Sequence, residues 1–379
     1  MSYMESDLRH KPSGFSKIFH LNWAVVLLLC AISCVGFLML YSVAGGSVTP
    51  WLAPQVKRFI VGMIALFFIA MTPIWFWRNV SGVFYLGSVL LLVGVEFFGE
   101  TGMGAQRWLD LGFMRLQPSE LTKITTVLFL AAYYDRLNLE QTSKLLWVLI
   151  PVIIIIIPVF LTFRQPDLGT ALLILLGGSA IIFLAGVHWG YFAAVISLVG
   201  VLVAVVLKTQ NTKWALLREY QYNRIQTFLH PSSDPLGAGY HITQSKIALG
   251  SGGLNGRGFM QGTQSRLNFL PEKHTDFIFT TLAEEFGFFG GLSILLMYAA
   301  VIVFCVLSAL SNKDRFSFLT TMGVAIIFFL YLSVNMAMVM GFAPIVGVPL
   351  PLISYGGSSM IVLLCAFGFM QSAHVHRLR

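Results

Sequence analysis

The sequence predicts an all-α polytopic membrane protein, and the first reason is its composition. Of the 379 residues, 57% are hydrophobic and only 11% are charged, and the mean hydropathy is +0.80. A soluble domain carries about 25% charged residues. Polar stretches are confined to the N-terminal tail, a loop near 99–117 and a long loop over 208–276. We therefore expect one integral membrane domain over residues 1–379 and no separate soluble domain.

The apolar segments are the second reason, because they predict about ten transmembrane helices. Several of them are close to the roughly twenty residues that cross a bilayer as a helix. The eighth is longer, and we expect it to tilt or to emerge from the membrane. The predicted spans are residues 21–44, 54–74, 80–98, 118–134, 145–162, 168–187, 189–207, 277–309, 317–342 and 352–372.

Local signals support individual spans in order along the chain. The first apolar run is too long for the hydrophobic region of a cleaved signal and follows a polar tail of residues 1–20, so it is expected to be an uncleaved anchor. The fourth span starts with Gln117-Pro118-Ser119, which is typical of a helix N-terminus. The last span begins in GVPLPLISYGGSS (347–359), whose two prolines and glycine pair predict a re-entrant or broken helix start.

The loop over 208–276 lies between the seventh and eighth spans, and its apolar content predicts order. Apolar residues at helical spacing in 214–228 predict an amphipathic helix lying on the membrane. Residues 241–249 predict a second short helix. The glycine run GSGGLNGRG (250–258) leaves two alternatives open, a flexible loop or a backbone contact with a diphosphate. It lacks the GK[ST] of a nucleotide-binding P-loop.

Positive charge in the short loops predicts the orientation. Ten Lys or Arg residues fall on the side of the two termini and five on the opposite side, which places both the N- and C-termini in the cytoplasm. The 69-residue loop is then extracytoplasmic, and its length allows it to be translocated despite its eight Lys/Arg. The first group is Arg9, Lys11, Lys17, Arg78, Arg136, Lys144, Lys313, Arg315, Arg377 and Arg379, and the second is Lys57, Arg58, Arg107, Arg115 and Arg164.

Composition also limits the class of function. The net charge is +8, but no basic stretch lies on a soluble domain, so nucleic acid is not an expected partner. The basic outer loop suits an anionic, lipid-linked substrate. The two halves show no repeat of the kind that marks many transporters, which argues against transport. The cysteines lie inside apolar spans without metal-ligand spacing, so we interpret them as inert packing thiols.

Asp276 is the sharpest candidate for chemistry, because it lies where the long loop meets the eighth span. A carboxylate at the mouth of a transmembrane bundle is a functional candidate by default. The alternative is a helix cap, in which Thr275 or Asp276 stabilises the first turn of FIFTTLAEE. The neighbouring Lys273 and His274 favour a functional carboxylate, and we expect such cations to hold it ionised as a base.

Two further charged groups face the same outer side in the ten-span topology. Glu120 and Lys123 are spaced i, i+3 on one helix face, as either a structural ion pair or, in the interpretation we favour, the polar wall of a substrate cavity. Asp167 and Arg164 flank the turn FRQPDLGT, where a local salt bridge or cap is the simpler interpretation. The histidines form no metal triad, so no metal site is predicted.

Five motifs lie in order over most of the chain and resemble the SEDS family (shape, elongation, division and sporulation proteins). GAGYHITQSKIALGSGG and GTQSRLNFLPEKHTDF are more similar to the elongation branch of that family than to its division branch. The motifs are GAQRWLDLG with LQPSE (104–120), QPDLGT (165–170), DPLGAGYHITQSKIALGSGG (234–253), LPEKHTDFIF (270–279) and PLPLISYGGSS (349–359).

The resemblance implies a peptidoglycan glycosyltransferase of cell elongation and rod-shape maintenance. It would polymerise lipid II into β-1,4-linked glycan on the outer face of the inner (cytoplasmic) membrane and release undecaprenyl diphosphate. The essential carboxylate of the family's HTDF-type motif is Asp276 here. With the residues beside it, the predicted substrate-binding positions are Arg107, Trp108, Glu120, Lys123, Asp167, Lys273, His274 and Thr275.

The resemblance also implies partners. The chain has no transpeptidase nucleophile arrangement, so cross-linking would fall to a class B penicillin-binding protein, together with other membrane proteins of the elongation complex. The sequence specifies no cofactor: a divalent cation (magnesium or manganese) on the diphosphate is compatible with the chemistry, but no ligand cluster demands it. The alternatives are a lipid II flippase or transporter, which needs polar lining through the membrane, and a septal polymerase of the division branch.

Overall fold

The computed structural model describes residues 14–102, 105–110, 112, 115–209, 238–266 and 272–377. Ten helices correspond one to one with the predicted spans, so the polytopic all-α architecture is confirmed. They are α2 (Trp23–Val43), α3 (Leu52–Met71), α4 (Ile74–Phe98), α5 (Pro118–Asp135), α7 (Leu145–Arg164), α8 (Leu168–Leu184), α9 (Trp189–Thr209), α13 (Ile278–Leu310), α14 (Arg315–Val339) and α15 (Ser359–Val375).

Two of these helices start elsewhere than predicted. The third span begins at Ile74 instead of residue 80, directly after Pro73, which occupies the cap position. The last begins at Ser359 instead of residue 352, because residues 341–358 form an irregular segment, of which 348–358 is mostly buried in the protein. The predicted broken start of this span is therefore confirmed, and its non-helical backbone lies against protein, as it must at membrane depth.

Shorter elements connect the helices. The predicted helix at 241–249 is confirmed as part of α11, whereas the amphipathic helix predicted at 214–228 lies outside the described residues. The polar loop near 99–117 contains a small antiparallel sheet in the order β1-β2-β3, an element the all-α prediction did not include. The connecting elements are η1 (Gly14–His20), α6 (Leu139–Thr142), α11 (Ala238–Ser251), α12 (Thr263–Arg266), β1 (Glu100–Gly102), β2 (Ala105–Asp110) and β3 (Arg115–Leu116).

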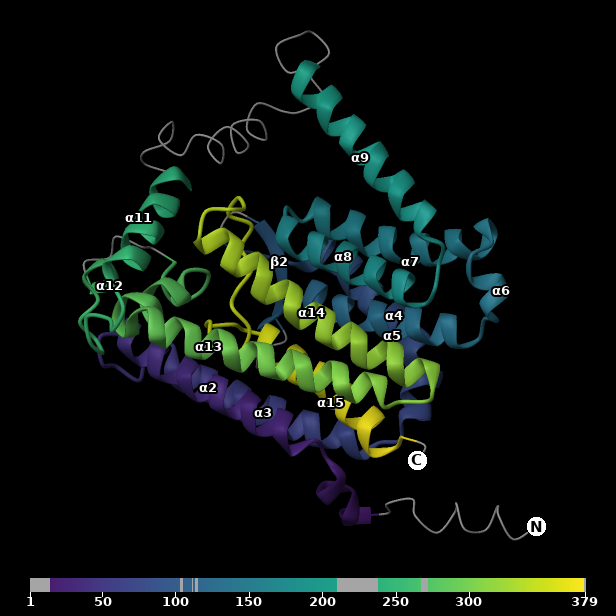
Figure 1. The fold of residues 1–379 in the computed structure, drawn as a ribbon, viewed down its shortest axis with the longest axis horizontal. Coiled ribbons are helices and arrows are strands. Elements are labelled where there is room, and N and C mark those ends of the chain that lie inside the picture. Colours follow the sequence, from purple (N-terminus) through teal and green to yellow (C-terminus); the bar gives the residue numbers. More distant parts are fainter. Residues whose placement is uncertain are drawn as a thin grey trace.

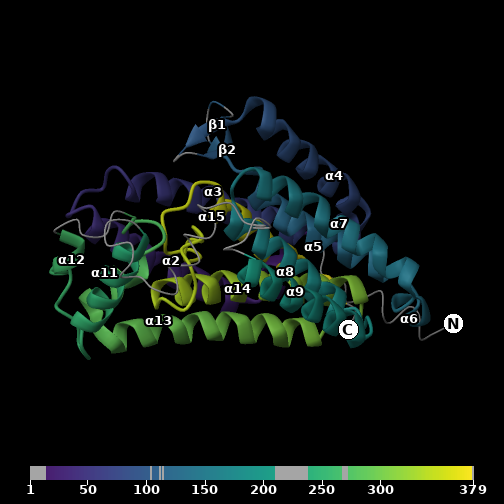
Figure 2. The ribbon, with the colours of Figure 1, turned by 90° about the horizontal axis from the view of Figure 1, so that it is seen from above.

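The helix ends fall into two polar layers. At the end that carries both termini, Gln371 exchanges hydrogen bonds with the backbone of Asn22, and the Ser372 hydroxyl donates to the Thr72 carbonyl. We call this layer the terminal end. At the opposite end lie α11, α12, the sheet and the 341–358 segment (Figures 1 and 2), and we call it the loop end. An even number of spanning helices explains why the first and last described residues lie in the same layer.

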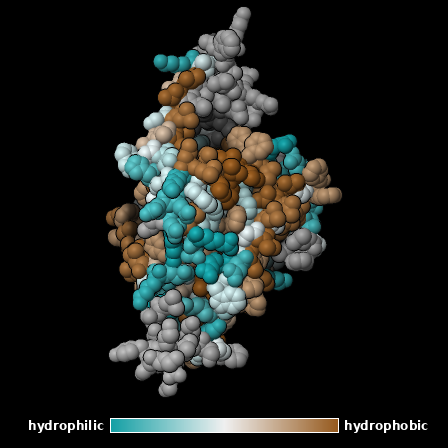
Figure 3. Space-filling model, turned by 90° about the vertical axis from the view of Figure 1, so that its right-hand side faces the viewer, coloured by the Kyte–Doolittle hydropathy of each residue, from teal (hydrophilic) through white to brown (hydrophobic). Residues whose placement is uncertain are grey.

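The sides of the molecule are apolar, as a lipid-facing surface requires. Phe68 on α3, Leu90 on α4 and Leu146 on α7 are 71%, 62% and 70% exposed. Figure 3 looks onto the terminal end, where hydrophilic side chains gather over the middle and hydrophobic ones flank them. Six of the described helices are long and apolar enough to cross a membrane by length and composition alone. The helix α5 is instead mostly buried, and it carries charge into the interior.

The long helix α13 is broken at Gly287, whose φ of 67° lies in the left-handed region. The glycine run packs against this break: the amides of Arg257 and Gly258 donate to the carbonyls of residues 284 and 285, and Phe288 donates back to Gly253. A side chain at Gly256 or Gly287 would overlap the opposing backbone. The amides of Arg257 and Gly258 therefore already have partners inside the protein and are not available to a diphosphate, and the glycine run is packed against α13.

Candidate functional site

Asp276 lies at the loop end, in the turn that precedes α13. The helix begins at Ile278 and its cap residue is Phe277, with no side-chain cap hydrogen bond. The capping interpretation of Thr275 or Asp276 is therefore wrong. The Thr275 hydroxyl instead donates to the Glu272 carboxylate at 2.9 Å. The Asp276 carboxylate is left available for another role.

The surroundings of the Asp276 carboxylate change its acidity. The pKa of this carboxyl is raised from 3.8 to about 7, mainly by burial and further by the charge of Glu272, while the Arg107 guanidinium acts in the opposite direction and lowers it. We expected neighbouring cations to dominate and keep the group ionised, and this expectation is wrong because desolvation is the larger effect. A carboxyl that titrates near neutral pH is well matched to general base catalysis.

Two of the three residues before Asp276, His274 and Lys273, also have shifted pKa values. The His274 ring stacks on Trp51 of the α2–α3 connection, with ring centroids 4.6 Å apart. Burial lowers the pKa of His274, Glu272 raises it and Lys273 lowers it, so the imidazole is predominantly neutral at neutral pH. Burial also lowers the pKa of the Lys273 ammonium.

Strand β2 brings Arg107 and Trp108 to the same region. The Arg107 Nε donates to the Gln165 carbonyl at 3.1 Å, and a terminal nitrogen donates to the Pro166 carbonyl. These two bonds fix the guanidinium over the α7–α8 turn. The Trp108 ring packs beside Gly357 in the irregular segment before α15, where a Cβ would lie 3.3 Å from the ring.

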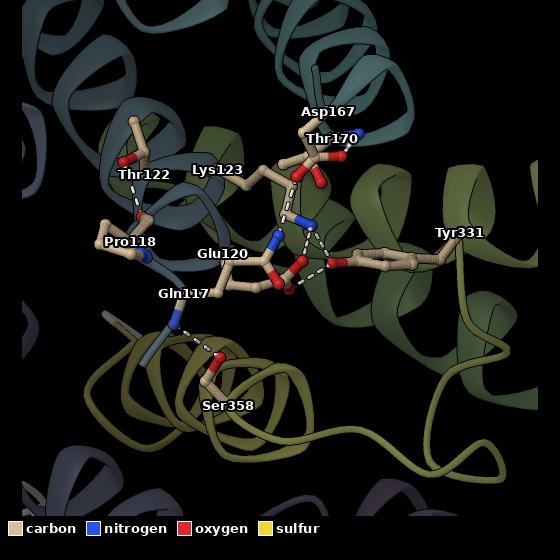
Figure 4. A network of polar contacts seen from close by, with 9 residues as sticks. All are labelled: Gln117, Pro118, Glu120, Thr122, Lys123, Asp167, Thr170, Tyr331 and Ser358. Atoms are coloured by element: carbon tan, nitrogen blue, oxygen red, sulfur yellow. Dashed lines mark hydrogen bonds and ion pairs between the residues drawn. The ribbon is translucent and has the colours of Figure 1, made fainter. Parts of the chain in front are cut away.

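Glu120 and Lys123 form an ion pair on α5 at 2.7 Å, with only 5% and 2% of each residue exposed. Tyr331 of α14 completes the group: its hydroxyl donates to the Glu120 carboxylate at 2.6 Å, and the Lys123 ammonium contacts the same hydroxyl (Figure 4). The three side chains line a small cavity together with Ser359 of α15. The geometry shows the structural ion pair, whereas the void beside it is too small for a sugar or a diphosphate, so the polar wall of a substrate cavity stays a prediction.

Asp167 caps α8 and also ties it to α5. Its carboxylate accepts from the Thr170 amide at 3.3 Å and from the Gln117 side-chain amide at 2.8 Å (Figure 4). The Gln117 backbone amide in turn donates to the Ser358 hydroxyl at 3.1 Å. A local salt bridge between residues 164 and 167 is wrong, because Arg164 pairs with Glu96 of α4 at 2.6 Å.

Sequence reasoning missed several residues of this region because their roles depend on partners far along the chain. Tyr331 and Asn335 lie one turn apart on α14, and the only available signal was a polar side chain inside an apolar span. Ser354 and Tyr355 were noted only as part of the broken helix start. Within the described ranges, no group of three or more His, Cys, Asp or Glu side chains is placed to hold a metal ion.

Comparisons with known proteins agree with this architecture. Residues 19–379 match a family model described as cell cycle protein, of the FtsW, RodA and SpoVE type. The chain is 40% identical to the peptidoglycan glycosyltransferase MrdB of Escherichia coli K12 over 377 residues, which cover 98% of both proteins. It is 38% identical to a probable peptidoglycan glycosyltransferase FtsW of Escherichia coli O6:H1 over 318 residues, covering 82% of this chain and 74% of that one.

Solved structures show the same fold. The rod shape determining protein RodA of Thermus thermophilus superposes with a TM-score of 0.70 at 27% identity, over 94% of this chain and 97% of that one. A chain from a peptidoglycan synthase complex, in a study of how polymerization and crosslinking are coordinated, superposes with a TM-score of 0.79 at 29% identity. That superposition covers 93% of this chain and 97% of the other.

Proposed function

Because this chain belongs to the FtsW, RodA and SpoVE family and is a peptidoglycan glycosyltransferase, we propose that Asp276 is the general base with which it extends a glycan strand from lipid II. The observation that carries the proposal is the state of this carboxylate. It lies at the loop end, takes no part in capping α13, and has a pKa raised to about 7 by burial. These properties are those of a base poised for proton transfer at neutral pH.

In the proposed reaction, the 4-hydroxyl of an acceptor sugar attacks the anomeric carbon of a lipid-linked donor. Asp276 takes the hydroxyl proton as the new C–O bond forms and the bond to the diphosphate breaks. Undecaprenyl diphosphate departs with the electron pair of that bond. Because the hydroxyl attacks from the face opposite the diphosphate, the α-linked donor gives a β-1,4 product. No paired acid is required, because a diphosphate leaves without being protonated, unlike the leaving groups that glycoside hydrolases protonate.

The basic residues of the loop end suit the departing diphosphate. Arg107 is held by two carbonyls of the α7–α8 turn and acts electrostatically on Asp276, which supports a position beside the reacting groups. Lys273 lies three residues before the base and adds a second cation. Positive groups fixed in advance stabilise the charge that develops on a leaving group. A divalent cation on the diphosphate is compatible with this scheme.

The remaining predicted residues act around this centre. We assign Trp108, His274 and Thr275 to the walls of the substrate site, since each lies on a segment that contacts the turn before α13 or the irregular segment. Glu120 and Lys123 line the cavity beside Tyr331, and Asp167 holds α8 against α5. Lipid II binding at Glu120 and Lys123 is part of the proposal and is tested separately below.

The distribution of charge argues for a polymerase over a flippase. In the ten helices, charged side chains lie near a helix end or near the break at Gly287. A flippase needs a polar path through the membrane. An elongation role is favoured over a septal one because the match to MrdB of Escherichia coli K12 has an identity of 40% over 377 residues, against 38% over 318 residues for FtsW of Escherichia coli O6:H1.

The surroundings of the enzyme follow from the same assignment. We place it in the inner membrane with the loop end outside the cell, in agreement with the bias of positive charge toward the terminal end. A class B penicillin-binding protein is the proposed partner that cross-links the product, with other membrane proteins of the elongation complex. The similarity to a chain of a peptidoglycan synthase complex supports a partner of this class.

The proposal is tested with purified chain, lipid II and gel analysis of the glycan product. Asp276→Asn preserves size and removes basicity, and loss of a general base lowers the rate by about 10²–10⁴-fold. The matched control is Asp110→Asn, another outer carboxylate, which is exposed and accepts a hydrogen bond from Gly112 that Asn can also accept. The control should polymerise normally. Folded Asp276→Asn protein that makes glycan at the wild-type rate would exclude Asp276 as the base.

A further inference from the structure

The backbone around the Asp276 carboxylate is held by donors from distant parts of the chain. We infer that Asn335 and Ser354 are positioning residues that fix the main chain on both sides of this carboxylate. This inference rests on the proposed role of Asp276. Neither side chain contacts the reacting atoms in this scheme. Each acts through the backbone of the segment over 274–276.

Three consecutive carbonyl groups of this segment accept hydrogen bonds. The Tyr355 amide donates to the His274 carbonyl at 2.9 Å, and the Ser354 hydroxyl donates to the Thr275 carbonyl at 2.6 Å. The Asn335 side-chain amide donates to the Asp276 carbonyl at 3.0 Å. A turn next to a long loop is ordinarily mobile. Here each peptide unit before α13 is tied to the 341–358 segment or to α14.

Asn335 joins the two backbones that lie on either side of the carboxylate. Its Nδ2 atom donates to the Asp276 carbonyl and also to the Val348 carbonyl at 2.7 Å. Both neighbours are acceptors, so the NH₂ group must face them and the assignment of the amide is unambiguous. Asn335 is fully buried, and within the described chain its Oδ1 atom accepts no hydrogen bond. Burying an amide oxygen without a hydrogen bond costs free energy, and the two bonds that the Nδ2 atom donates explain why an amide occupies this position.

Ser354 connects α3 to the same segment through hydrogen bonds. Its hydroxyl accepts from the Leu350 amide at 2.8 Å while donating to the Thr275 carbonyl. Its own carbonyl accepts from the Gln55 side chain at 3.0 Å, and the Gln55 oxygen accepts from the Gly356 amide at 3.3 Å. The irregular segment is thereby fastened to a spanning helix on one side and to the base on the other.

The result is a defined place for the carboxylate. A Cβ at Gly347 would lie 3.8 Å from the Asp276 Oδ2 atom, and the φ of 72° at this position favours glycine. Val348, the next residue, is the one that Asn335 bonds. The Asn335 side-chain amide therefore holds both the main chain of Asp276 and the main chain beside its carboxylate. A displacement of about 1 Å of a catalytic group costs on the order of 10²-fold in rate.

The experiment separates positioning from general packing by measuring kcat and KM for lipid II with purified full-length protein. Ser354→Ala removes the hydroxyl, Ser354→Thr keeps it, and Asn335→Leu replaces the amide by an apolar side chain of similar size. The matched control is Ser308→Ala, a buried serine at the terminal end whose hydroxyl bonds His374 at 2.9 Å. Thermal melting in detergent records the folding of each variant.

We expect Ser354→Ala and Asn335→Leu to lower kcat by about 10- to 100-fold with KM changed less than about twofold. Ser354→Thr should recover most of the rate, and Ser308→Ala should match wild type. A kcat for folded Ser354→Ala within about twofold of wild type, or a rise in KM that accounts for its whole defect, overturns the inference. If Asn335→Leu does not fold, the three-way comparison at Ser354 decides.

Asp276→Asn, assayed in parallel, keeps the two proposals distinguishable. An active Asp276→Asn protein removes the base assignment and, with it, the reason for positioning. An inactive Asp276→Asn protein beside a fully active Ser354→Ala protein overturns only the inference about Asn335 and Ser354.

Discussion

The pH dependence of glycan synthesis is the sharpest consequence of the raised pKa of Asp276. Only the ionised carboxylate can accept the hydroxyl proton, so activity should rise as pH rises through the pKa of about 7. With that midpoint, the ionised fraction is about one tenth at pH 6 and about nine tenths at pH 8, which predicts a roughly tenfold increase in rate. A carboxyl of ordinary acidity, with a pKa of 3.8, would give a flat profile over this range.

Glu272→Gln tests the physical cause of this profile. The charge of Glu272 raises the pKa of Asp276, so its removal should move the midpoint to lower pH and increase the relative activity at pH 6. Gln keeps an oxygen that can accept the Thr275 hydroxyl bond. His274 would give a midpoint at lower pH than Asp276, because burial lowers the pKa of His274 from its ordinary value of 6.5.

Stability should change with pH in the opposite direction. A carboxyl whose pKa is raised from 3.8 to about 7 binds more protons in the folded state than in the unfolded state between these values. The free energy of unfolding therefore falls as pH rises across that window. Asp276→Asn, which is always neutral, should melt at a higher temperature than wild type at pH 8, and the difference should shrink at pH 5.

The assay is initial-rate polymerisation of lipid II by purified protein between pH 6 and 8, with substrate binding measured at each pH. Asp276→Asn should be inactive throughout this range. A wild-type profile that is flat from pH 6 to 8, or a midpoint that does not move in Glu272→Gln, would refute the assignment of this titration to Asp276.

Three further predictions concern other parts of the molecule. Gly287→Ala should lower the free energy of unfolding by about 1–3 kcal/mol, because φ is 67° and a Cβ would overlap the Gly256 backbone. Its control is Gly94→Ala, whose added Cβ would have no atom within 4 Å, and this variant should melt like wild type. Lys123→Met should lower the free energy of unfolding by about 3–5 kcal/mol, since it leaves the buried Glu120 carboxylate without its cation. The swap Glu120→Lys with Lys123→Glu should fold but polymerise lipid II poorly. Full activity of the swap would mark the pair as purely structural. A co-purified class B penicillin-binding protein should raise the polymerisation rate even when its own active site is blocked, and equal rates at confirmed binding would remove activation by this partner.

The spanning helices could be predicted because each one depends mainly on its own run of residues. A run of apolar residues needs no distant partner to favour the membrane, since its own side chains face lipid and its own backbone bonds are internal. Helix ends were less predictable: α4 starts earlier than expected at Ile74, and α15 starts later at Ser359, where the bend of the segment before it depends on tertiary packing.

The candidate site divides along the same line. The sequence by itself made Asp276, Glu120, Lys123 and Asp167 candidates, because acidic and basic residues are rare in such a chain and burying a charge is costly. The family resemblance added Arg107. The sequence left open whether Asp276 is a cap or a base. It gave no sign that Tyr331, Asn335 and Ser354 join these residues.

The tertiary structure excludes the cap and shows which distant residues lie beside Asp276, because the deciding contacts join residues far apart in the sequence. Ser354 and Thr275 are 79 positions apart, and Tyr331 and Glu120 are 211 apart. The acidity of Asp276 is likewise set by burial beneath other segments, which reverses the expectation drawn from its charged neighbours. Local charge and spacing determine which groups are present, whereas desolvation and hydrogen-bond geometry depend on which parts of the folded chain enclose them.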